Sequence, residues 1–163
     1  MEYKKHTHRE HILSLPDTYI GSVETTTEDM FVVEGEKFVP KTVKVFNPGF
    51  YKLFDEILVN AHDHVIRTRQ KELTPVKNIT IEISPTNDWI TVENDGEGID
   101  VIQHPEYKVW VPQMIFGELL TSTNYDKDEK KLVGGKNGYG VKLANIFSKE
   151  LKVETVDAKT QDR

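Results

Sequence analysis

Four polar residues, Glu56, Asn60, Asp63 and Arg67, follow one another at spacings of four, three and four. On an α-helix these spacings place all four side chains in one stripe. Mg²⁺ on a nucleotide takes most of its ligands from water and phosphate, so the amide oxygen of Asn60 could be its single protein ligand. Glu56, one turn earlier, could orient and deprotonate an attacking water. Taken alone, such a stripe is more often a solvated helix face.

A glycine-rich segment could supply the phosphate site that this chemistry needs. Residues 134–140 contain four glycines and precede apolar residues at helical spacing. Backbone N–H groups and the positive end of a helix dipole would meet there, which favours an anion such as phosphate. Lys136 and Lys142 would add positive charge. The alternative is a flexible surface loop. The segment matches neither the Walker loop nor the dinucleotide fingerprint.

A second pair of glycines could approach a base. Asn94 and Asp95 lead directly from a predicted strand into Gly96 and Gly98. Glycine lets a flat ligand approach the backbone, and an amide or carboxylate beside it could receive the exocyclic amine of a base. The alternative is an ordinary turn. Together with the polar stripe, the two glycine segments describe an ATP hydrolase.

The elements that must position these residues follow from hydrophobic spacing and from helix and strand breakers. The central one is a helix over residues 50–69, which has a broad apolar face beside the polar stripe. Before it we predict a helix over 8–15 capped by Thr7, a turn over 16–21, and strands over 30–34 and 38–46 joined at Gly35. After it we predict a hairpin of strands 78–84 and 89–93, helices over 111–120 and 141–147, a charged loop over 121–133 and a strand over 151–156. This order lacks regular βαβ alternation and favours an α+β fold with a mostly antiparallel sheet.

The composition is that of an ordinary soluble globular protein, with 37% hydrophobic and 29% charged residues among 163. No apolar run approaches the roughly 20 residues that span a bilayer, and the first residues lack the apolar core of a secretion signal. The absence of cysteine excludes disulfides and zinc–thiolate sites. The net charge of −6 disfavours gripping DNA through its phosphates as the principal task. These features fit an intracellular protein without a membrane partner.

Three motifs resemble the signature of the GHKL ATPases: Glu56-x-x-x-Asn60, Asn94-x-Gly96-x-Gly98 and Gly134-Gly135-x-Asn137-Gly138-x-Gly140. That superfamily includes gyrase-type topoisomerases, heat-shock chaperones, mismatch-repair ATPases and histidine kinases. Longer segments narrow the match: PDTYIGSVE (16–24), FDEILVNA (54–61), LLTSTNYDKDEKK (119–131) and GGKNGYGVKLANIFS (134–148). They resemble the ATPase region of eukaryotic-type type II DNA topoisomerases, in the same order and over nearly the whole chain.

The resemblance implies a site for ATP and Mg²⁺. It makes Glu56 the general base and Asn60 the Mg²⁺ ligand, and it places Asp63 near the nucleotide. It assigns further residues by their place around the ligand: Asn94, Gly98, Ile99, Ile115 and Phe116 at the base, Ser122, Thr123 and Asn124 near the ribose and phosphates, and Gly135, Lys136, Asn137, Gly138, Tyr139, Gly140, Val141 and Lys142 in the lid over the triphosphate. Tyr19 matches an arm residue that reaches the nucleotide across a dimer.

A few positions depart from the family pattern. Lys136 stands where arginine is common and Val141 where alanine is common, both conservative for a site built from backbone N–H groups. His62 and His64 stand where alanine and asparagine are more frequent, and we interpret them as surface or dimer-contact variation. The family also has a transducer domain with a lysine that contacts the γ-phosphate, which this sequence lacks.

The resemblance further implies a GHKL (Bergerat-type) sandwich, with a mixed, mostly antiparallel sheet and helices on one face. We expect an N-terminal arm over residues 1–24 that makes dimer contacts, and an ATP-binding domain over 25–163 that is incomplete at its C-terminal end. The chain is therefore expected to be a fragment, weakly active or inactive alone.

The implied function is the ATP-driven gate of a type II topoisomerase. ATP binding would dimerise two N-terminal regions around a duplex DNA, and DNA would be cleaved elsewhere in the parent enzyme. The setting would be the nucleus, or the host cell or virion for a virus-encoded enzyme. Two alternatives stay open: a non-catalytic nucleotide-binding or dimerisation module, and another GHKL member of the chaperone or kinase type. The segments 16–22 and 121–131 argue against the latter.

Overall fold

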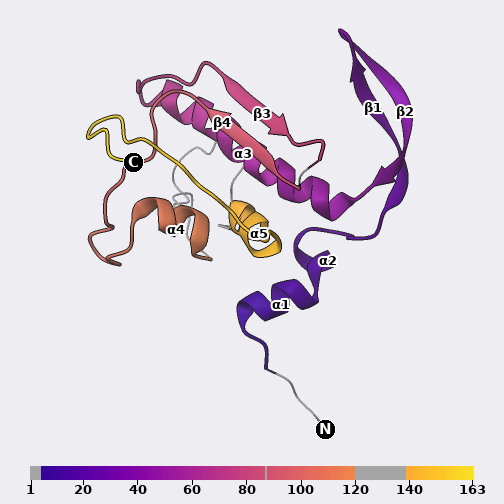
Figure 1. The fold of residues 1–163 in the computed structure, drawn as a ribbon, viewed down its shortest axis with the longest axis horizontal. Helices are drawn as coiled ribbons and strands as arrows, with labels where there is room; N and C mark the ends of the chain where they lie inside the picture. The colour runs from indigo at the N-terminus through magenta and orange to yellow at the C-terminus, as the bar shows by residue number, and fades with distance from the viewer. Residues whose placement is uncertain (1–4, 87, 120–138) are drawn as a thin grey trace. The chain divides into compact units, whose positions relative to one another are not determined.

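The computed structural model of the chain describes residues 5–86, 88–119 and 139–163, which Figure 1 draws in colour. The chain divides into two units, Met1–Asp55 and Glu56–Arg163. The elements form in the order helix, helix, hairpin, long helix, hairpin, helix, helix, and the predicted α+β class is confirmed. Among the described residues, no helix is long and apolar enough to cross a membrane.

The first unit begins with two short helices. α1 (His8–Ser14) starts with a capping box, in which Thr7 Oγ1 accepts from the Glu10 N–H at 3.3 Å and the Glu10 carboxylate accepts from the Thr7 N–H at 2.7 Å. α2 (Pro16–Tyr19) replaces the predicted turn. Proline suits the first helical position, so Pro16 ends one helix and starts the next.

A β-hairpin follows, formed by β1 (Thr26–Glu34) and β2 (Lys37–Phe46). The strands are antiparallel, with Val32 opposite Val39, and Gly35 takes a φ of +61° in the connection. The hairpin corner was predicted correctly. β1 starts four residues before the predicted position 30. Thr26, of a strand-favouring type, pairs with Phe46, and the hydroxyls of Thr26 and Thr27 donate to carbonyls of β2.

The predicted central helix is α3 (Pro48–Gln70), which extends the predicted range 50–69 at both ends. Asn47 caps it, because its Oδ1 accepts from the Phe50 N–H at 2.8 Å. Gly49 fits closely against the preceding segment, since a Cβ there would lie 3.1 Å from both the Ile20 side chain and the Ser22 carbonyl. The helix therefore begins on a cap and a close backbone approach.

The second unit holds the rest of α3, the hairpin of β3 (Ile79–Ile83) and β4 (Ile90–Asn94), and the helices α4 (Val111–Gly117) and α5 (Gly140–Phe147). β3 and β4 are antiparallel, with Ile81 opposite Val92. α4 and α5 pack together (Figure 1), and Asn145 Nδ2 donates to the Phe116 carbonyl at 3.1 Å. The buried apolar residues of this unit are Ala61, Val76, Val141, Leu143 and Ala144.

Three predictions about elements differ from the structure. The described strands form two separate two-stranded antiparallel sheets. α4 ends at Gly117 because Glu118 is extended, whereas the prediction ran to 120. The segment 151–156 is not a strand. Its contacts with residues 99–101 run through side chains: Thr155 Oγ1 accepts from the Ile99 N–H, and Asp157, just after the segment, accepts from the Val101 N–H. The predicted loop 121–133 lies outside the described residues.

Candidate functional site

The polar stripe of α3 carries the two residues with predicted chemistry. Glu56 is half-buried and Asn60 is exposed. Asn60 Nδ2 donates to the Glu56 backbone carbonyl at 2.5 Å, which directs the amide nitrogen back along the helix and its oxygen away from that carbonyl. Asp63, one turn further, is only 6% exposed. The stripe is therefore not a uniformly solvated face, because Glu56 is half-buried, Asn60 is exposed and Asp63 is buried.

α5 begins directly beside these residues. A Cβ built on Gly140 would overlap the Glu56 carboxylate and lie 3.8 Å from Asn60 Nδ2. The first N–H groups of a helix have no partner within it, and they carry its positive dipole end. The structure thus brings Glu56, Asn60 and Gly140 together and places a carboxylate, an amide and a helix N-terminus in one location.

The first turn of α5 is buried. Val141 and Lys142 are each 6% exposed, and Tyr139 caps the helix without a side-chain hydrogen bond. Burial lowers the pKa of the Lys142 ammonium, because a low-dielectric environment disfavours the charged form. The structure therefore places Lys142 in the first turn of α5 with its side chain buried.

Asn94 ends β4 and is half-buried, and its Nδ2 donates to the Asp95 carbonyl at 3.0 Å. The glycines after it have packing reasons of their own. Gly96 has a φ of +94°, and a Cβ there would lie 2.9 Å from Val76. A Cβ on Gly98 would overlap the Val156 carbonyl. Both glycines thus allow close packing of other segments of this chain, whereas the sequence interpretation considered only the approach of a ligand.

Ile99, Ile115 and Phe116 are half-buried in the second unit. The Ile99 N–H donates to Thr155 Oγ1 at 2.9 Å. Phe116 helps to line a hollow of about 260 Å³, together with Pro112, Gln113, Gly117, Asn145, Leu151 and Val153. Of the predicted base-contacting residues, this hollow includes Phe116 alone, so it is not the predicted nucleotide pocket.

Two residues of this region make contacts that the sequence analysis did not predict. Asp95 Oδ1 accepts from the backbone N–H groups of Lys77 at 2.6 Å and Asn78 at 2.9 Å. These donors, Asn78 first, lower the pKa of the Asp95 carboxyl. His64 is half-buried and its Nε2 lies 2.5 Å from the Glu97 carbonyl. His64 therefore contacts the glycine segment, a contact that the interpretation as surface or dimer-contact variation did not include. The sequence signal for this contact was that His64 lies four residues after Asn60, which places both side chains on one face of the helix.

Tyr19 belongs to the first unit, where its hydroxyl lies 2.8 Å from His11 Nδ1 and the two rings meet edge to face. Seven predicted site residues lie outside the described residues: Ser122, Thr123, Asn124, Gly135, Lys136, Asn137 and Gly138.

The donor set fits a nucleotide-bound Mg²⁺ better than a metal held mainly by protein. In the part of the chain that the structure describes, no three His, Cys, Asp or Glu side chains group as a metal site. Asn60, whose amide oxygen is directed away from the helix carbonyl, offers one neutral oxygen ligand beside Glu56. Mg²⁺ on a nucleotide needs only one or two ligands from protein.

Comparisons with known proteins agree on one family. Residues 47–162 match the family described as histidine kinase-, DNA gyrase B- and HSP90-like ATPase. The chain is 53% identical to DNA topoisomerase 2-alpha of Gallus gallus over 153 residues, which cover 94% of this chain and 10% of that protein. It is 50% identical to DNA topoisomerase 2 of Acanthamoeba polyphaga mimivirus over 163 residues, covering 96% of this chain and 12% of that protein.

The solved structures give the same result. The fold is similar to the crystal structure of the ATPase region of Saccharomyces cerevisiae topoisomerase II, with a TM-score of 0.82 and 47% identity. That match covers 90% of this chain and 38% of the solved one. The chain thus spans about a tenth of the curated relatives that it matches.

Proposed function

The chain belongs to the family of histidine kinase-, DNA gyrase B- and HSP90-like ATPases, and from this premise we propose that it binds and hydrolyses ATP as the N-terminal gate region of a type II DNA topoisomerase. The observation that carries the proposal is the start of α5 at Gly140, beside the Glu56 carboxylate and the Asn60 amide. A phosphate held by the first N–H groups of α5 would lie next to Glu56, the proposed general base, and Asn60, the proposed metal ligand.

Glu56 is the general base of the proposed reaction. Its carboxylate accepts a proton from a water molecule as the water oxygen forms a bond to the γ-phosphorus. The bond between the γ-phosphorus and the bridging oxygen to the β-phosphorus breaks, and ADP leaves with that electron pair. The proton on Glu56 then passes to solvent. Asn60 would hold Mg²⁺ through its amide oxygen, and the ion would neutralise charge on the triphosphate.

The other site residues divide by the part of ATP that they would contact. Asn94 and Gly98, at the end of β4 and after it, would contact the base together with Ile99, Ile115 and Phe116. Lys142 and the backbone of Tyr139 and Gly140 belong to the triphosphate end, with the predicted lid residues before them. Asp63, which is buried on the stripe of α3, would lie near the nucleotide.

Dimerisation and DNA capture belong to the whole protein. We propose that ATP drives two copies together through the N-terminal arm, with Tyr19 reaching the partner's nucleotide, and that the closed gate holds a duplex which is cleaved elsewhere. The net charge of −6 supports a gate that encloses DNA without gripping its phosphates. Relatives from a bird and a virus are similarly close, so a nuclear and a virus-encoded setting are both retained.

Substitution of the proposed base tests the function. In the full-length protein, Glu56→Gln keeps the shape of the side chain and removes its basicity. We expect unchanged calorimetric affinity for a non-hydrolysable ATP analogue with Mg²⁺, and a single-turnover hydrolysis rate lowered by about 10²–10⁴, the usual contribution of general base catalysis. Asp55→Asn, on the neighbouring acid of α3, is the matched control.

Normal hydrolysis by Glu56→Gln would remove Glu56 from the mechanism. Magnesium-dependent nucleotide binding without turnover in the wild-type protein would instead favour the passive nucleotide-binding or dimerisation module.

A further inference from the structure

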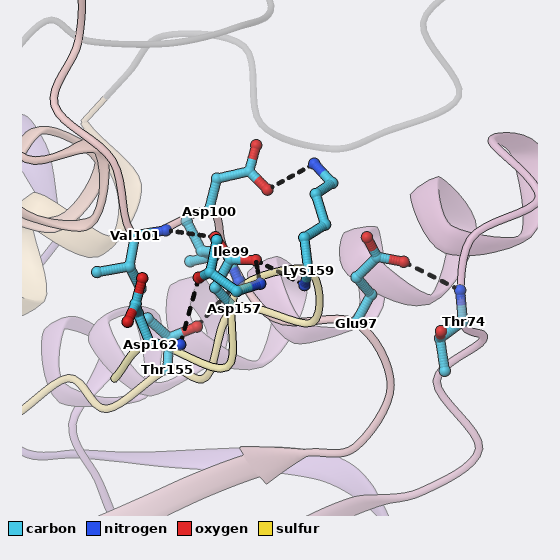
Figure 2. A network of polar contacts seen from close by, with 10 residues as sticks. Thr74, Glu97, Ile99, Asp100, Val101, Thr155, Asp157, Lys159 and Asp162 are labelled. Atoms are coloured by element: carbon cyan, nitrogen blue, oxygen red, sulfur yellow. Dashed lines mark hydrogen bonds and ion pairs between the residues drawn. The ribbon is translucent and has the colours of Figure 1, made fainter.

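The segment 94–101 is here called the base loop. Its first half is held by hydrogen bonds to residues 74–78. Asp95 accepts from the backbone N–H groups of Lys77 and Asn78. Glu97 pairs with Thr74 twice: its N–H donates to the Thr74 carbonyl at 3.1 Å, and its carboxylate accepts from the Thr74 N–H at 3.2 Å. Figure 2 shows this Glu97–Thr74 contact. These bonds fix the loop against the segment that leads into β3.

The other side of the base loop is held by the segment 155–159 (Figure 2). The Val101 N–H donates to Asp157 Oδ2 at 3.0 Å. Lys159 Nζ pairs with Asp100 Oδ1 at 2.9 Å, and this exposed pair adds little. Asp157 itself is 2% exposed and also accepts from the Lys159 N–H at 2.8 Å. The loop is therefore fastened at both ends, with Gly98 between the two anchors.

His64 fastens the middle of the base loop to α3. Its Nε2 lies 2.5 Å from the Glu97 carbonyl, the group directly before Gly98. A carbonyl oxygen can only accept, so Nε2 carries the proton and donates it. On α3, His64 is four residues after Asn60, and residues at this spacing lie one above the other. One face of the helix thus presents the proposed metal ligand and, a turn later, the contact to the base loop.

From this juxtaposition we propose that His64 is a positioning residue for nucleotide recognition, an inference that rests on the proposed function. By holding the Glu97 carbonyl, His64 fixes the distance between the base loop, with Asn94 and Gly98, and Asn60 at the triphosphate end. ATP has to reach both ends at once. A loop displaced from α3 leaves the phosphate contacts intact and misplaces the base contacts.

A role confined to fold stability makes a different prediction. A destabilised protein would lose affinity for every ligand of the site in parallel. Loss of positioning weakens only ligands that carry the base, so inorganic tripolyphosphate is the informative comparison, because it occupies the triphosphate end alone. Bound ATP would still react at the same rate, because Glu56 and Asn60 are unchanged.

The test uses His64→Ala and His64→Leu in the full-length protein, the second of which keeps the side-chain bulk without a donor. We expect KM for ATP to rise about two- to tenfold, the worth of one hydrogen bond, with kcat and the inhibition constant of tripolyphosphate unchanged. His64→Gln should restore KM, because its amide nitrogen reaches about as far as Nε2. His62→Ala removes an exposed histidine two residues earlier on the same helix and should behave as wild type.

Unchanged KM in both variants, equal losses for ATP and tripolyphosphate, or an equal effect of His62→Ala would each overturn the positioning role. Failure of the proposed function appears separately, as a wild-type protein without magnesium-dependent ATP binding.

Discussion

At Gly140 the absence of a side chain leaves room for the Glu56 carboxylate beside the first residue of α5. Its backbone lies so close to Glu56 that a Cβ would overlap the carboxylate. The atom in the way is the far end of a flexible side chain, so a substitution would move the carboxylate rather than break the fold. A substitution at position 140 should therefore affect the reaction without lowering the stability of the fold.

Gly140→Ala should keep the protein folded and slow its reaction. Alanine favours a helix over glycine by up to about 1 kcal/mol, so the unfolding midpoint should not fall. Turnover should drop by about 10², the effect of misplacing a catalytic group by roughly 1 Å. Thermal melting and ATP hydrolysis measure the two properties. Gly117→Ala is the matched control, since a Cβ there meets only the Gln113 Cγ at 4.0 Å. Equal hydrolysis by both variants would contradict this account of Gly140.

At the scale of elements, side-chain caps mark where α1 and α3 begin. Asn47 begins α3, and the Thr7–Glu10 capping box begins α1. The Thr7 N–H and the Glu10 carboxylate are 2.7 Å apart, and this bond lowers the pKa of the Glu10 carboxyl more than any other contact. α1 has seven residues, and a helix this short needs its cap to persist.

Thr7→Ala should loosen α1 locally. Loss of an N-cap costs about 1 kcal/mol, so the Glu10 amide, which donates to Thr7 Oγ1, should exchange hydrogen about fivefold faster. Amide exchange followed by mass spectrometry or NMR measures this. Ser14→Ala, at the other end of α1, removes a hydroxyl without touching the cap. An unchanged exchange rate at Glu10 in Thr7→Ala would show that the capping box does not hold the helix.

For the whole molecule, buried and hydrogen-bonded carboxylates set the response to acid. Backbone N–H donors, Lys159 foremost, lower the pKa of Asp157 from its ordinary 3.8, and Asn78 and Lys77 do the same for Asp95. A carboxylate with a lowered native pKa stabilises the fold above its unfolded pKa. That contribution disappears as the pH falls through the native value.

The 163-residue chain should therefore keep a nearly constant unfolding midpoint between about pH 7 and 5 and lose stability below about pH 4, where carboxylates begin to bind protons. Asp157→Asn should melt earlier at neutral pH and decline less steeply in acid. Melting curves at a series of pH values test this, with the exposed Asp88→Asn as control. Parallel acid branches for wild type and Asp157→Asn would exclude Asp157 as a source of the pH dependence.

Much of the molecule was predictable because its signals are local. The helical period and the Asn47 cap lie within α3 itself, and Gly35 marks the hairpin corner. The predicted α+β class and the GHKL family are confirmed by the fold and by the comparisons. The roles of Glu56 and Asn60 remain predictions, although the structure places both beside the start of α5.

The amino-acid sequence alone thus determined most of the elements, the polar stripe of α3 and the family, since helical periods, caps and motifs are read from neighbouring residues. Tertiary structure alone decided which distant groups meet. His64 contacts Glu97 across 33 positions, and Ile99 contacts Thr155 across 56. No local pattern specifies such partners: from the sequence alone Asp157 is an ordinary charged residue, and only the fold shows that it is buried and accepts from the Val101 N–H.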